Sequence, residues 1–233
     1  MKLEIIYEDK EIIVCYKPSG IASQTASLAG QDMVSMVKNY LAKQQKEKSP
    51  YLGVIHRLDQ PVSGILVFAK TKKAAADLSR QIQDGNANKD YLAFCCYIPE
   101  EKKGTLQHYI MKDPVSRLAK VSQKEENASY KKASLSYEVE RVEKDCAVLK
   151  IHLHTGRFHQ IRAQFSQAGN PLLGDGKYGT EESSAIAREK GIHEIALCAY
   201  QLTFKHPRTG EKMEFALKEE FLPDWYKGQE NRK

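Results

Sequence analysis

Hydrophobic and polar residues follow two different periods along this chain, which predicts a fold that contains both strands and helices. The alternation with a period of two that is typical of strands spans residues 3–7 and 12–16, joined by a tight charged turn at 8–10. Residues 65–69 form an apolar run of strand length, and 91–98 are expected to form another strand. These segments are the strands predicted for the N-terminal part of the chain.

The helical period of apolar residues appears in three other places. Residues 31–43 carry apolar side chains at helical spacing, and so do 72–84, where Gly85 is expected to cap the helix. A third helix is expected to begin near Phe158, just after a strand that ends at Gly156. Strands and helices therefore both contribute to the predicted fold.

Two further segments alternate around residues 135–139 and 149–153, each with its apolar side chains on one face. Residues 104–132 form a polar, variable region to which no element is assigned. Adjacent antiparallel strands with helices between others predict an α+β fold, with a mixed, largely antiparallel sheet and flanking helices. We expect one domain over 1–226, built either as a single body or as two lobes, and a flexible tail at 227–233.

Length and composition exclude several classes of protein. At 233 residues the chain can bury a sizeable core. No run approaches the roughly 18 consecutive apolar residues that a membrane-spanning helix needs, and the N-terminus lacks the apolar segment of a signal peptide. The five cysteines are odd in number and lack C-x-x-C spacing, so we expect them to be reduced and mostly buried in a cytoplasmic protein.

The net charge points toward a polyanionic partner. The chain carries 36 Lys and Arg against 30 Asp and Glu, a net charge of +6. The lysine-rich stretches at 43–48, 70–73 and 131–132 fit either phosphate contacts or ordinary solvated faces. We expect the positive charge to line a central cleft.

The residues at 56–64 read His-Arg-Leu-Asp-Gln-Pro-Val-Ser-Gly and lead straight into the apolar run at 65–69. They place one carboxylate, Asp59, between a basic pair and a Ser-Gly turn. Nearby cations favour the charged form of a carboxylate, and glycine permits a sharp turn or a close approach to a ligand. The pattern fits a single reactive Asp at the mouth of a cleft, with a salt-bridged surface loop as the alternative.

Two other blocks carry candidate chemistry. Residues 153–165 contain Thr-Gly-Arg-Phe-His-Gln-Ile-Arg, in which His159 and Arg162 are three apart and are expected to share a helix face. Lys89-Asp90-Tyr91 begins the strand predicted after Gly85. An aromatic ring there can stack on a nucleobase, and the alternative is an ordinary core tyrosine.

Some patterns suggest other functions but lack the required context. Residues 174–179 satisfy G-x-G-x-x-G, yet a helix and a proline turn precede them where a dinucleotide site needs a strand. His152, His154 and His159 have no fourth ligand at a suitable spacing for a metal. The His-Arg-Leu-Asp run differs from a kinase catalytic loop, and the chain has neither D-F-G nor a glycine-rich N-terminal loop.

The three blocks together resemble the signature motifs of the RNA pseudouridine synthases of the large-subunit type. They occur in that family's order, and the Lys-Pro-x-Gly after the first predicted hairpin is also usual in it. The resemblance covers nearly the whole chain, from Glu4 to the strand around Leu202. It implies the pseudouridine synthase fold and an enzyme that converts uridine to pseudouridine in ribosomal or transfer RNA.

The resemblance implies three catalytic residues, Asp59, Tyr91 and Arg162. Asp59 is the nucleophile, attacking ribose C1′ or uracil C6 of a flipped nucleotide. Arg162 contacts and orients Asp59 through parallel hydrogen bonds, and Tyr91 stacks on the uracil and helps to remove the C5 proton. The residues expected to contact the substrate RNA are His56, Arg57, Lys89, Arg157, His159, Gln160 and Ile161. Among them, Arg57 is placed to fill the gap left by the flipped base or to bind phosphate, and Ile161 to wall the uracil pocket or to serve the core.

Isomerisation needs neither a redox cofactor nor an energy donor, so we expect no cofactor, no metal and no nucleotide. RNA is the expected partner, with no membrane association and a monomeric state. Two positions depart from the family pattern: Val62 replaces the usual Thr, and Gln164 the usual His. The predicted hairpin starts at Leu3, so we expect no N-terminal domain of the S4 type.

Two other functions stay open. One is a catalytically inactive RNA-binding or ribosome assembly factor with the same fold, which the joint presence of Asp59, Tyr91 and Arg162 argues against. The other is a glycoside hydrolase that uses Asp59, but no second carboxylate stands out as its partner. The residues do not indicate which RNA or which uridine is the target.

Overall fold

The computed structural model describes residues 2–25, 31–45 and 49–227. It confirms the predicted α+β class, with helices and strands along the whole described chain. The tail predicted at 227–233 lies outside the described residues, apart from Lys227 at the end of the last helix.

The chain divides into two compact units, which we call unit 1 and unit 2. Unit 1 comprises Met1–Lys89 and Ala199–Phe221, and unit 2 comprises Asp90–Cys198 and Leu222–Lys233. Unit 1 is therefore discontinuous in sequence, because the main segment of unit 2 separates its two parts.

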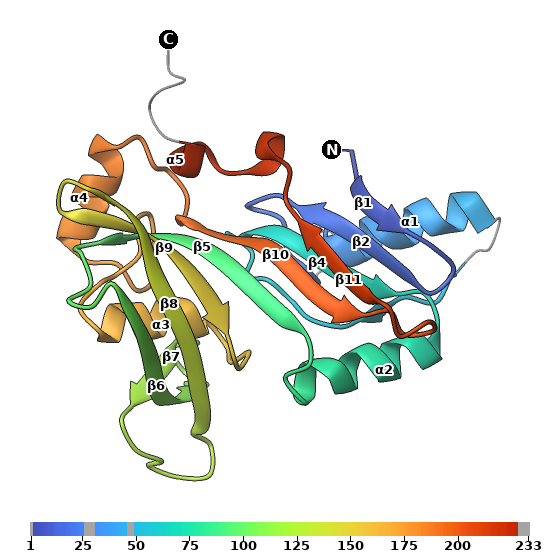
Figure 1. Cartoon of the computed structure of the whole chain (residues 1–233), viewed down its shortest axis with the longest axis horizontal. Helices are drawn as coiled ribbons and strands as arrows, with labels where there is room; N and C mark the ends of the chain where they lie inside the picture. The colour runs from blue at the N-terminus through green and yellow to red at the C-terminus, as the bar shows by residue number, and fades with distance from the viewer. Residues whose placement is uncertain (1, 26–30, 46–48, 228–233) are drawn as a thin grey trace. The chain divides into compact units, whose positions relative to one another are not determined.

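Unit 1 is built on antiparallel strands with two helices (Figure 1). Its strands are β1 (Glu4–Glu8), β2 (Ile12–Lys17), β3 (Gly53–Val54), β4 (Ser63–Ala69), β10 (Leu197–Lys205, from Ala199 onward) and β11 (Lys212–Ala216). Its helices are α1 (Met33–Gln45), α2 (Lys72–Gln83) and the short 3-10 turn η1 (Glu219–Phe221). The strand order is β1-β2-β4-β10, with β3 paired to β4 and β11 to β10.

Strand β4 is the centre of unit 1. All its residues are buried, as the uninterrupted apolar run predicts for a strand covered on both faces. It pairs antiparallel with β2, so that Gly64 lies opposite Lys17. Gly64 has φ +137°, and a Cβ there would lie 2.6 Å from Cβ of Ala199. Only glycine permits this approach of the Ala199 backbone.

Helix α2 matches its prediction closely, and its ends show why. The side chain of Thr71 accepts the backbone N–H of Ala74 at 3.1 Å, a hydrogen bond typical of an N-cap. At the other end the capping residue is Asp84, not the predicted Gly85. Gly85 follows it with φ +72°, the left-handed position that glycine usually occupies just past a helix.

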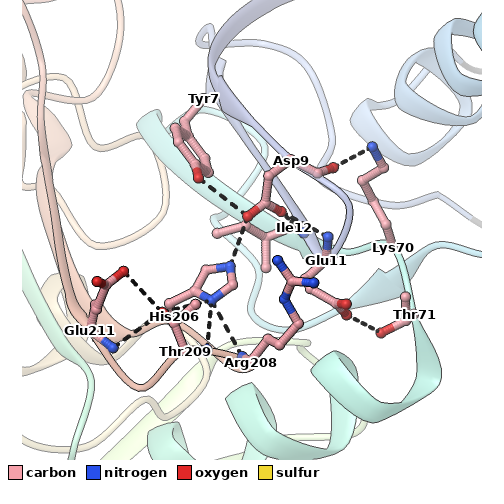
Figure 2. A network of polar contacts seen from close by, with 10 residues as sticks. All are labelled: Tyr7, Asp9, Glu11, Ile12, Lys70, Thr71, His206, Arg208, Thr209 and Glu211. Carbon is pink, nitrogen blue, oxygen red and sulfur yellow. Dashed lines mark hydrogen bonds and ion pairs between the residues drawn. The ribbon is translucent and has the colours of Figure 1, made fainter.

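A polar network ties the β1–β2 turn to the β10–β11 turn (Figure 2). Nε2 of buried His206 lies 2.7 Å from Oδ2 of Asp9, while its Nδ1 accepts the backbone N–H groups of Arg208 and Thr209 at 3.3 and 3.1 Å. Because Nδ1 accepts, the ring proton sits on Nε2 and is donated to Asp9. This contact joins residues 197 positions apart.

Lys70 belongs to the same network (Figure 2). Its Nζ donates to Oε1 of Glu8 at 2.6 Å and to the backbone carbonyl of Asp9 at 2.5 Å, and its side chain is 11% exposed. Lys70 is therefore neither a phosphate contact nor part of a solvated face. It forms a structural ion pair with Glu8 within unit 1.

Unit 2 is a second antiparallel assembly (Figure 1). Its strands are β5 (Asn88–Cys96, from Asp90 onward), β6 (Lys103–Lys112), β7 (Ala119–Ser122), β8 (Lys131–Glu143) and β9 (Cys146–Leu153). Its helices are α3 (Gln160–Gln167), α4 (Glu181–Glu189) and α5 (Asp224–Lys227). The strand order is β5-β9-β8-β6-β7. Phe94, Val148 and Leu173 lie in its core, against which Trp225 of α5 packs.

No element was predicted over 104–132, where the structure has β6 and β7. The inward positions of β6 include Gly104 and buried His108, whereas Tyr109 and Met111 occupy the outward positions. Leu106 and Ile110 also lie at inward positions, but the small and polar residues beside them, with apolar residues on the outer face, weaken the alternation that reveals a strand. The predicted strand at 91–98 also differs, because β5 starts at Asn88 and ends at Cys96.

Two other sequence-based expectations can be compared with the fold. All five cysteines are buried and none forms a disulfide bond, in agreement with the prediction that they are mostly buried. Within the described ranges, no helix is both long and apolar enough to cross a membrane.

Candidate active site

Asp59 lies in the loop between β3 and β4 of unit 1, where it is half-buried. Its backbone carbonyl accepts the N–H of Val62 at 3.0 Å, which closes a turn through Pro61. The preceding residue, Leu58, is anchored twice: Oγ of Ser23 donates to its carbonyl at 2.7 Å, and its N–H donates to the same Oγ at 2.9 Å. The backbone beside Asp59 is therefore held on both sides.

Lys17 contacts the same loop through the backbone carbonyl of Gln60. It was not predicted as a site residue. Its side chain is completely buried, and Nζ donates to the carbonyls of Pro18, Ile21 and Gln60 at 2.9, 2.6 and 2.9 Å. The Lys-Pro-x-Gly motif was the available signal, because the Lys17 contacts unite that motif with the residue after Asp59. Three carbonyl acceptors stabilise a buried ammonium in place of a carboxylate.

The basic residues around Asp59 have different environments. Arg57 is exposed, as an RNA-contacting residue would be. His56 accepts the N–H of Val67 through Nε2 at 3.3 Å. Burial, and secondly the charge of Lys89, lower the pKa of His56 to about 3, so that His56 is neutral at physiological pH. Lys89 is buried, and burial lowers its pKa as well.

In unit 2, Arg162 forms a buried bidentate ion pair. Its Nε and Nη2 donate to Oδ2 and Oδ1 of Asp175 at 2.8 and 2.6 Å, and both side chains are at most 4% exposed. The guanidinium carbon lies 5.1 Å from the centre of the Tyr178 ring. A paired charge with an aromatic face beside it has a fixed orientation. The role of Asp175 and Tyr178 as partners of Arg162 was not predicted.

Residues 174–179 form a turn. Oδ1 of Asp175 accepts the backbone N–H groups of Lys177 and Tyr178 at 2.9 and 3.2 Å. One carboxylate thus closes the turn and holds Arg162. The Gly-Asp dipeptide followed by Tyr-Gly was the sequence signal for this arrangement.

The sequence predicted that His159 and Arg162 share a helix face. In the structure, His159 does not lie on the helix. It is the N-cap residue of α3, with φ +52° in the left-handed region. Its ring stacks on Phe158 with centroids 3.7 Å apart, and Nδ1 lies 2.8 Å from the hydroxyl of Tyr178. That hydroxyl accepts the backbone N–H of Ala119 at 2.6 Å. His159 and Arg162 therefore meet through Tyr178, not through a shared helix face.

Gln160 and Arg157 shape the loop before α3. Oε1 of Gln160 accepts the hydroxyl of Thr155 at 2.8 Å and the N–H of Arg157 at 2.9 Å, while Nε2 donates to the carbonyl of Ser134 at 3.1 Å. Arg157 is exposed, and its Nε donates to the carbonyl of Lys132 at 2.9 Å. The Gln160 side chain thus has a clear structural role. Contact of either residue with RNA stays a prediction.

The positions that depart from the family pattern are both buried. Val62 is 2% exposed and Gln164 is fully buried. Nε2 of Gln164 lies 3.0 Å from Nδ1 of His108, whereas its Oε1 has no hydrogen-bond partner among the described residues. Ile161 is also buried, which suits a core residue and leaves a pocket wall as a prediction.

Tyr91 lies on β5, is 7% exposed, and pairs with Ile151 of β9. The neighbouring histidines do not form a metal site. His152 lies 2.6 Å from Asp90, and its ring meets that of His154 edge to face. In the part of the chain that the structure describes, no group of three or more His, Cys, Asp or Glu could hold a metal ion.

The predicted site residues thus fall into two sets. His56, Arg57, Asp59 and Lys89 belong to unit 1, whereas Tyr91 and the residues of the α3 region belong to unit 2. The predicted contact of Asp59 with Arg162 would join the two sets and stays a prediction.

Comparison with known proteins gives one family. The family model described as RNA pseudouridylate synthase matches residues 11–167. An uncharacterized RNA pseudouridine synthase of Aquifex aeolicus is 33% identical over 226 residues, covering 93% of this chain and 69% of that protein. The ribosomal large subunit pseudouridine synthase C of Haemophilus influenzae is 29% identical, covering 91% and 64%.

Further matches agree with these. The ribosomal large subunit pseudouridine synthase D of Neisseria meningitidis is 32% identical, and the match covers 92% of this chain and 58% of that protein. This chain therefore spans between 58% and 69% of the length of these three bacterial relatives. Among solved structures, human RNA pseudouridylate synthase domain containing 4 superposes with a TM-score of 0.76 at 22% identity, over 96% of this chain and 90% of that one.

Proposed function

The chain belongs to the RNA pseudouridylate synthase family, and from this premise we propose that it isomerises specific uridines to pseudouridine in structured RNA. The observation that supports this most strongly is the family match over 11–167, a range that includes Asp59, Tyr91 and Arg162. Relatives named as ribosomal large subunit enzymes favour ribosomal RNA as the substrate. Transfer RNA is the second candidate.

The proposed reaction changes the connection between base and sugar without changing the composition of the nucleotide. The bond between N1 of uracil and C1′ of ribose breaks, the uracil turns while it stays bound, and C5 bonds to C1′. The proton on C5 is lost and N1 gains one, so atoms and electrons balance without a cofactor. A stacked base cannot turn in this way, so the target nucleotide must leave its helix or come from a loop.

Asp59 is the proposed nucleophile. It attacks either C1′ or C6, and each route gives a covalent intermediate that holds one part of the nucleotide while the base turns. The double anchor at Leu58 and the Lys17 contacts to Gln60 support this role, because a nucleophile needs a fixed backbone.

Arg162 and Tyr91 complete the proposed machinery. Arg162 orients Asp59 and keeps it ionised, and its own rigid support by Asp175 favours such a role. Tyr91 stacks on the uracil and helps to remove the C5 proton. Arg57, Arg157 and the other predicted contacts bind the RNA around the target. We propose that the protein acts as a cytoplasmic monomer.

The direct test is a map of pseudouridines in total RNA from cells with and without the gene. We expect specific sites to vanish, and to return with the wild-type gene or with Asp145→Ala, a control on an exposed turn. Asp59→Ala should not restore them. Full restoration by Asp59→Ala would instead favour a catalytically inactive RNA-binding or assembly factor.

RNA binding can be tested separately from chemistry. A protein that neutralises phosphates releases counterions, so log affinity should fall linearly with log salt, by roughly 0.7–0.9 per phosphate contact. Filter binding over a series of salt concentrations measures this slope. An affinity that ignores salt would contradict a basic RNA-binding surface.

A further inference from the structure

Three lysines of unit 1 are almost removed from water, and they differ in what surrounds their ammonium groups. Lys17 donates to three backbone carbonyls, and Lys70 has the Glu8 carboxylate at 2.6 Å. Lys89 is 8% exposed. Among the residues that the structure describes, its Nζ takes part in no hydrogen bond and no ion pair. Lys89 is therefore the exception that needs an explanation.

An ammonium group in this state is costly to the fold. Removing a charge from water without a partner costs several kcal/mol, and burial correspondingly lowers the pKa of Lys89. The contacts within the chain offset none of this cost. Strained or unpaired charge that stability does not require is typical of functional sites.

The surroundings of Lys89 connect it to the proposed catalytic loop. Its charge acts on His56, three residues before Asp59 on the same loop. His56 is neutral, so it supplies no negative charge to balance the ammonium of Lys89. Lys89 is also two residues before Tyr91 on β5, and residues two apart on a strand point to the same face. Lys89 thus belongs to the unit that carries the loop of the proposed nucleophile, and along the chain it is two residues from the proposed stacking residue.

We propose that Nζ of Lys89 binds an anionic oxygen of the RNA substrate, which supplies the partner that the chain itself lacks. This inference rests on the proposed function. Two oxygens of a uridine in RNA have the required chemistry. One belongs to the phosphodiester of the target nucleotide, and the other is a uracil oxygen that becomes negative during the reaction.

Both routes of Asp59 attack charge a uracil oxygen. If C1′ is attacked, the electron pair of the N1–C1′ bond leaves with the uracil and is shared by O2 and O4. If C6 is attacked, the C5–C6 double bond shifts toward C4 and O4 receives the negative charge. In each case a buried cation stabilises the charge with a hydrogen bond and transfers no proton, in the manner of an oxyanion hole.

The experiment compares Lys89→Met and Lys89→Arg with the wild type, using an unmodified RNA transcript that contains a mapped uridine. Lys38→Met is the matched control, because Lys38 is exposed on α1 and lies outside the lysine-rich stretches. Two quantities are measured: the dissociation constant over a series of salt concentrations, and the rate of pseudouridine formation in a single turnover with saturating enzyme. Thermal unfolding of each variant is recorded alongside.

The two oxygens give different results. If Lys89 binds the phosphodiester, Lys89→Met weakens binding and lowers the salt slope by about 0.7–0.9, with the single-turnover rate retained. If it binds a uracil oxygen, binding and slope stay unchanged while the rate falls about 10²–10³-fold. In both cases Lys89→Arg keeps most of the binding or rate that Lys89→Met loses, and Lys38→Met resembles the wild type.

Two other results would overturn the inference. The first is a Lys89→Met variant whose dissociation constant and single-turnover rate both equal those of the wild type. A fall of the melting temperature by more than about 5 °C in Lys89→Met would do so too, because an unpaired charge should not stabilise the fold. A wild-type protein that makes no pseudouridine would refute the proposed function, and the binding measurements would still test Lys89.

Discussion

At the scale of single residues, the buried charges of the two units differ in their partners. In unit 2, Nε and Nη2 of Arg162 donate to the Asp175 carboxylate at 2.8 and 2.6 Å. In unit 1, the proposed partner of buried Lys89 is an oxygen of the substrate. The first arrangement should dominate stability, and the second should hardly affect it. Both expectations can be measured by unfolding.

We expect Asp175→Asn to lower the free energy of unfolding by about 3–5 kcal/mol, because Arg162 would lose the carboxylate of its buried bidentate ion pair. Glu138→Gln is the matched control. It removes a carboxylate that pairs with Lys103 at the surface, where side chains are 48% and 68% exposed, and it should cost about 0–1 kcal/mol. Urea titration of both variants measures the difference, and equal losses would contradict the prediction.

Gly64 and Gly20 allow the cost of backbone conformation to be separated from the cost of a steric clash. Both have positive φ, but a Cβ at Gly20 meets nothing within 4 Å, whereas a Cβ at Gly64 collides with the carbonyl oxygen and side chain of Ala199. Gly20→Ala should cost about 1–2 kcal/mol from the left-handed conformation alone. Gly64→Ala should cost about 1–3 kcal/mol more. Thermal unfolding of both variants provides the test.

Sequence patterns located some site residues and missed others for a physical reason. The motifs identified Asp59, Arg162 and Tyr91 as candidates because each occurs in a short, continuous run. The partners of Arg162 could not be deduced in that way, since Asp175 acts across 13 positions through a turn. The left-handed backbone of His159 was also missed, because no local pattern signals a non-glycine residue at positive φ.

At the scale of elements, the Asp9–His206 contact joins two turns and should make unfolding depend on pH. Burial raises the pKa of Asp9, but hydrogen bonds from the backbone of Ile12 and Glu11 and from His206 outweigh it, so the net pKa is lowered. A lowered pKa means that the ionised form is favoured in the folded state. The contribution is therefore complete above the ordinary pKa of about 3.9 and is lost as pH falls through the folded value.

Asp9→Asn should accordingly lower the free energy of unfolding by about 1–3 kcal/mol near pH 7. The gap between wild type and variant should narrow as the pH falls below about 4, because protonated Asp9 resembles the amide. Urea unfolding at a series of pH values measures it. A gap that stays constant down to pH 2 would show that the charge of Asp9 contributes nothing.

Elements with a single clear period were predictable, and those without one were not. The β1–β2 hairpin, α2 and the buried strand β4 appear within one or two residues of their predicted positions. The β6–β7 hairpin was lost because its inward face carries Gly104 and His108. Its stability comes from pairing with β8, which no pattern within the segment can indicate.

At the scale of the whole molecule, unit 1 is one body made from two distant segments. β4 pairs with β10, and His206 reaches back to Asp9, so the segments should gain and lose protection together. Unit 2 has its own core around Phe94 and Val148.

Hydrogen exchange measured by mass spectrometry tests this division. In His206→Ala we expect faster exchange in β2 and β4 as well as in β10 and β11, with a smaller change in β8 and β9. Val148→Ala, a core variant of unit 2, should show the reverse distribution. Uniform acceleration over the chain in both variants would indicate a single cooperative body instead.

The discontinuity of unit 1 also bears on how the protein is made. During translation its first 89 residues leave the ribosome about 110 residues before Ala199 does. At 5–20 residues per second, this is a delay of roughly 5–20 s. Throughout it, the edge of β4 that later pairs with β10 is open, a state in which strands pair with wrong partners. The nascent chain is thus a natural client for ribosome-associated chaperones, although each finished unit is compact.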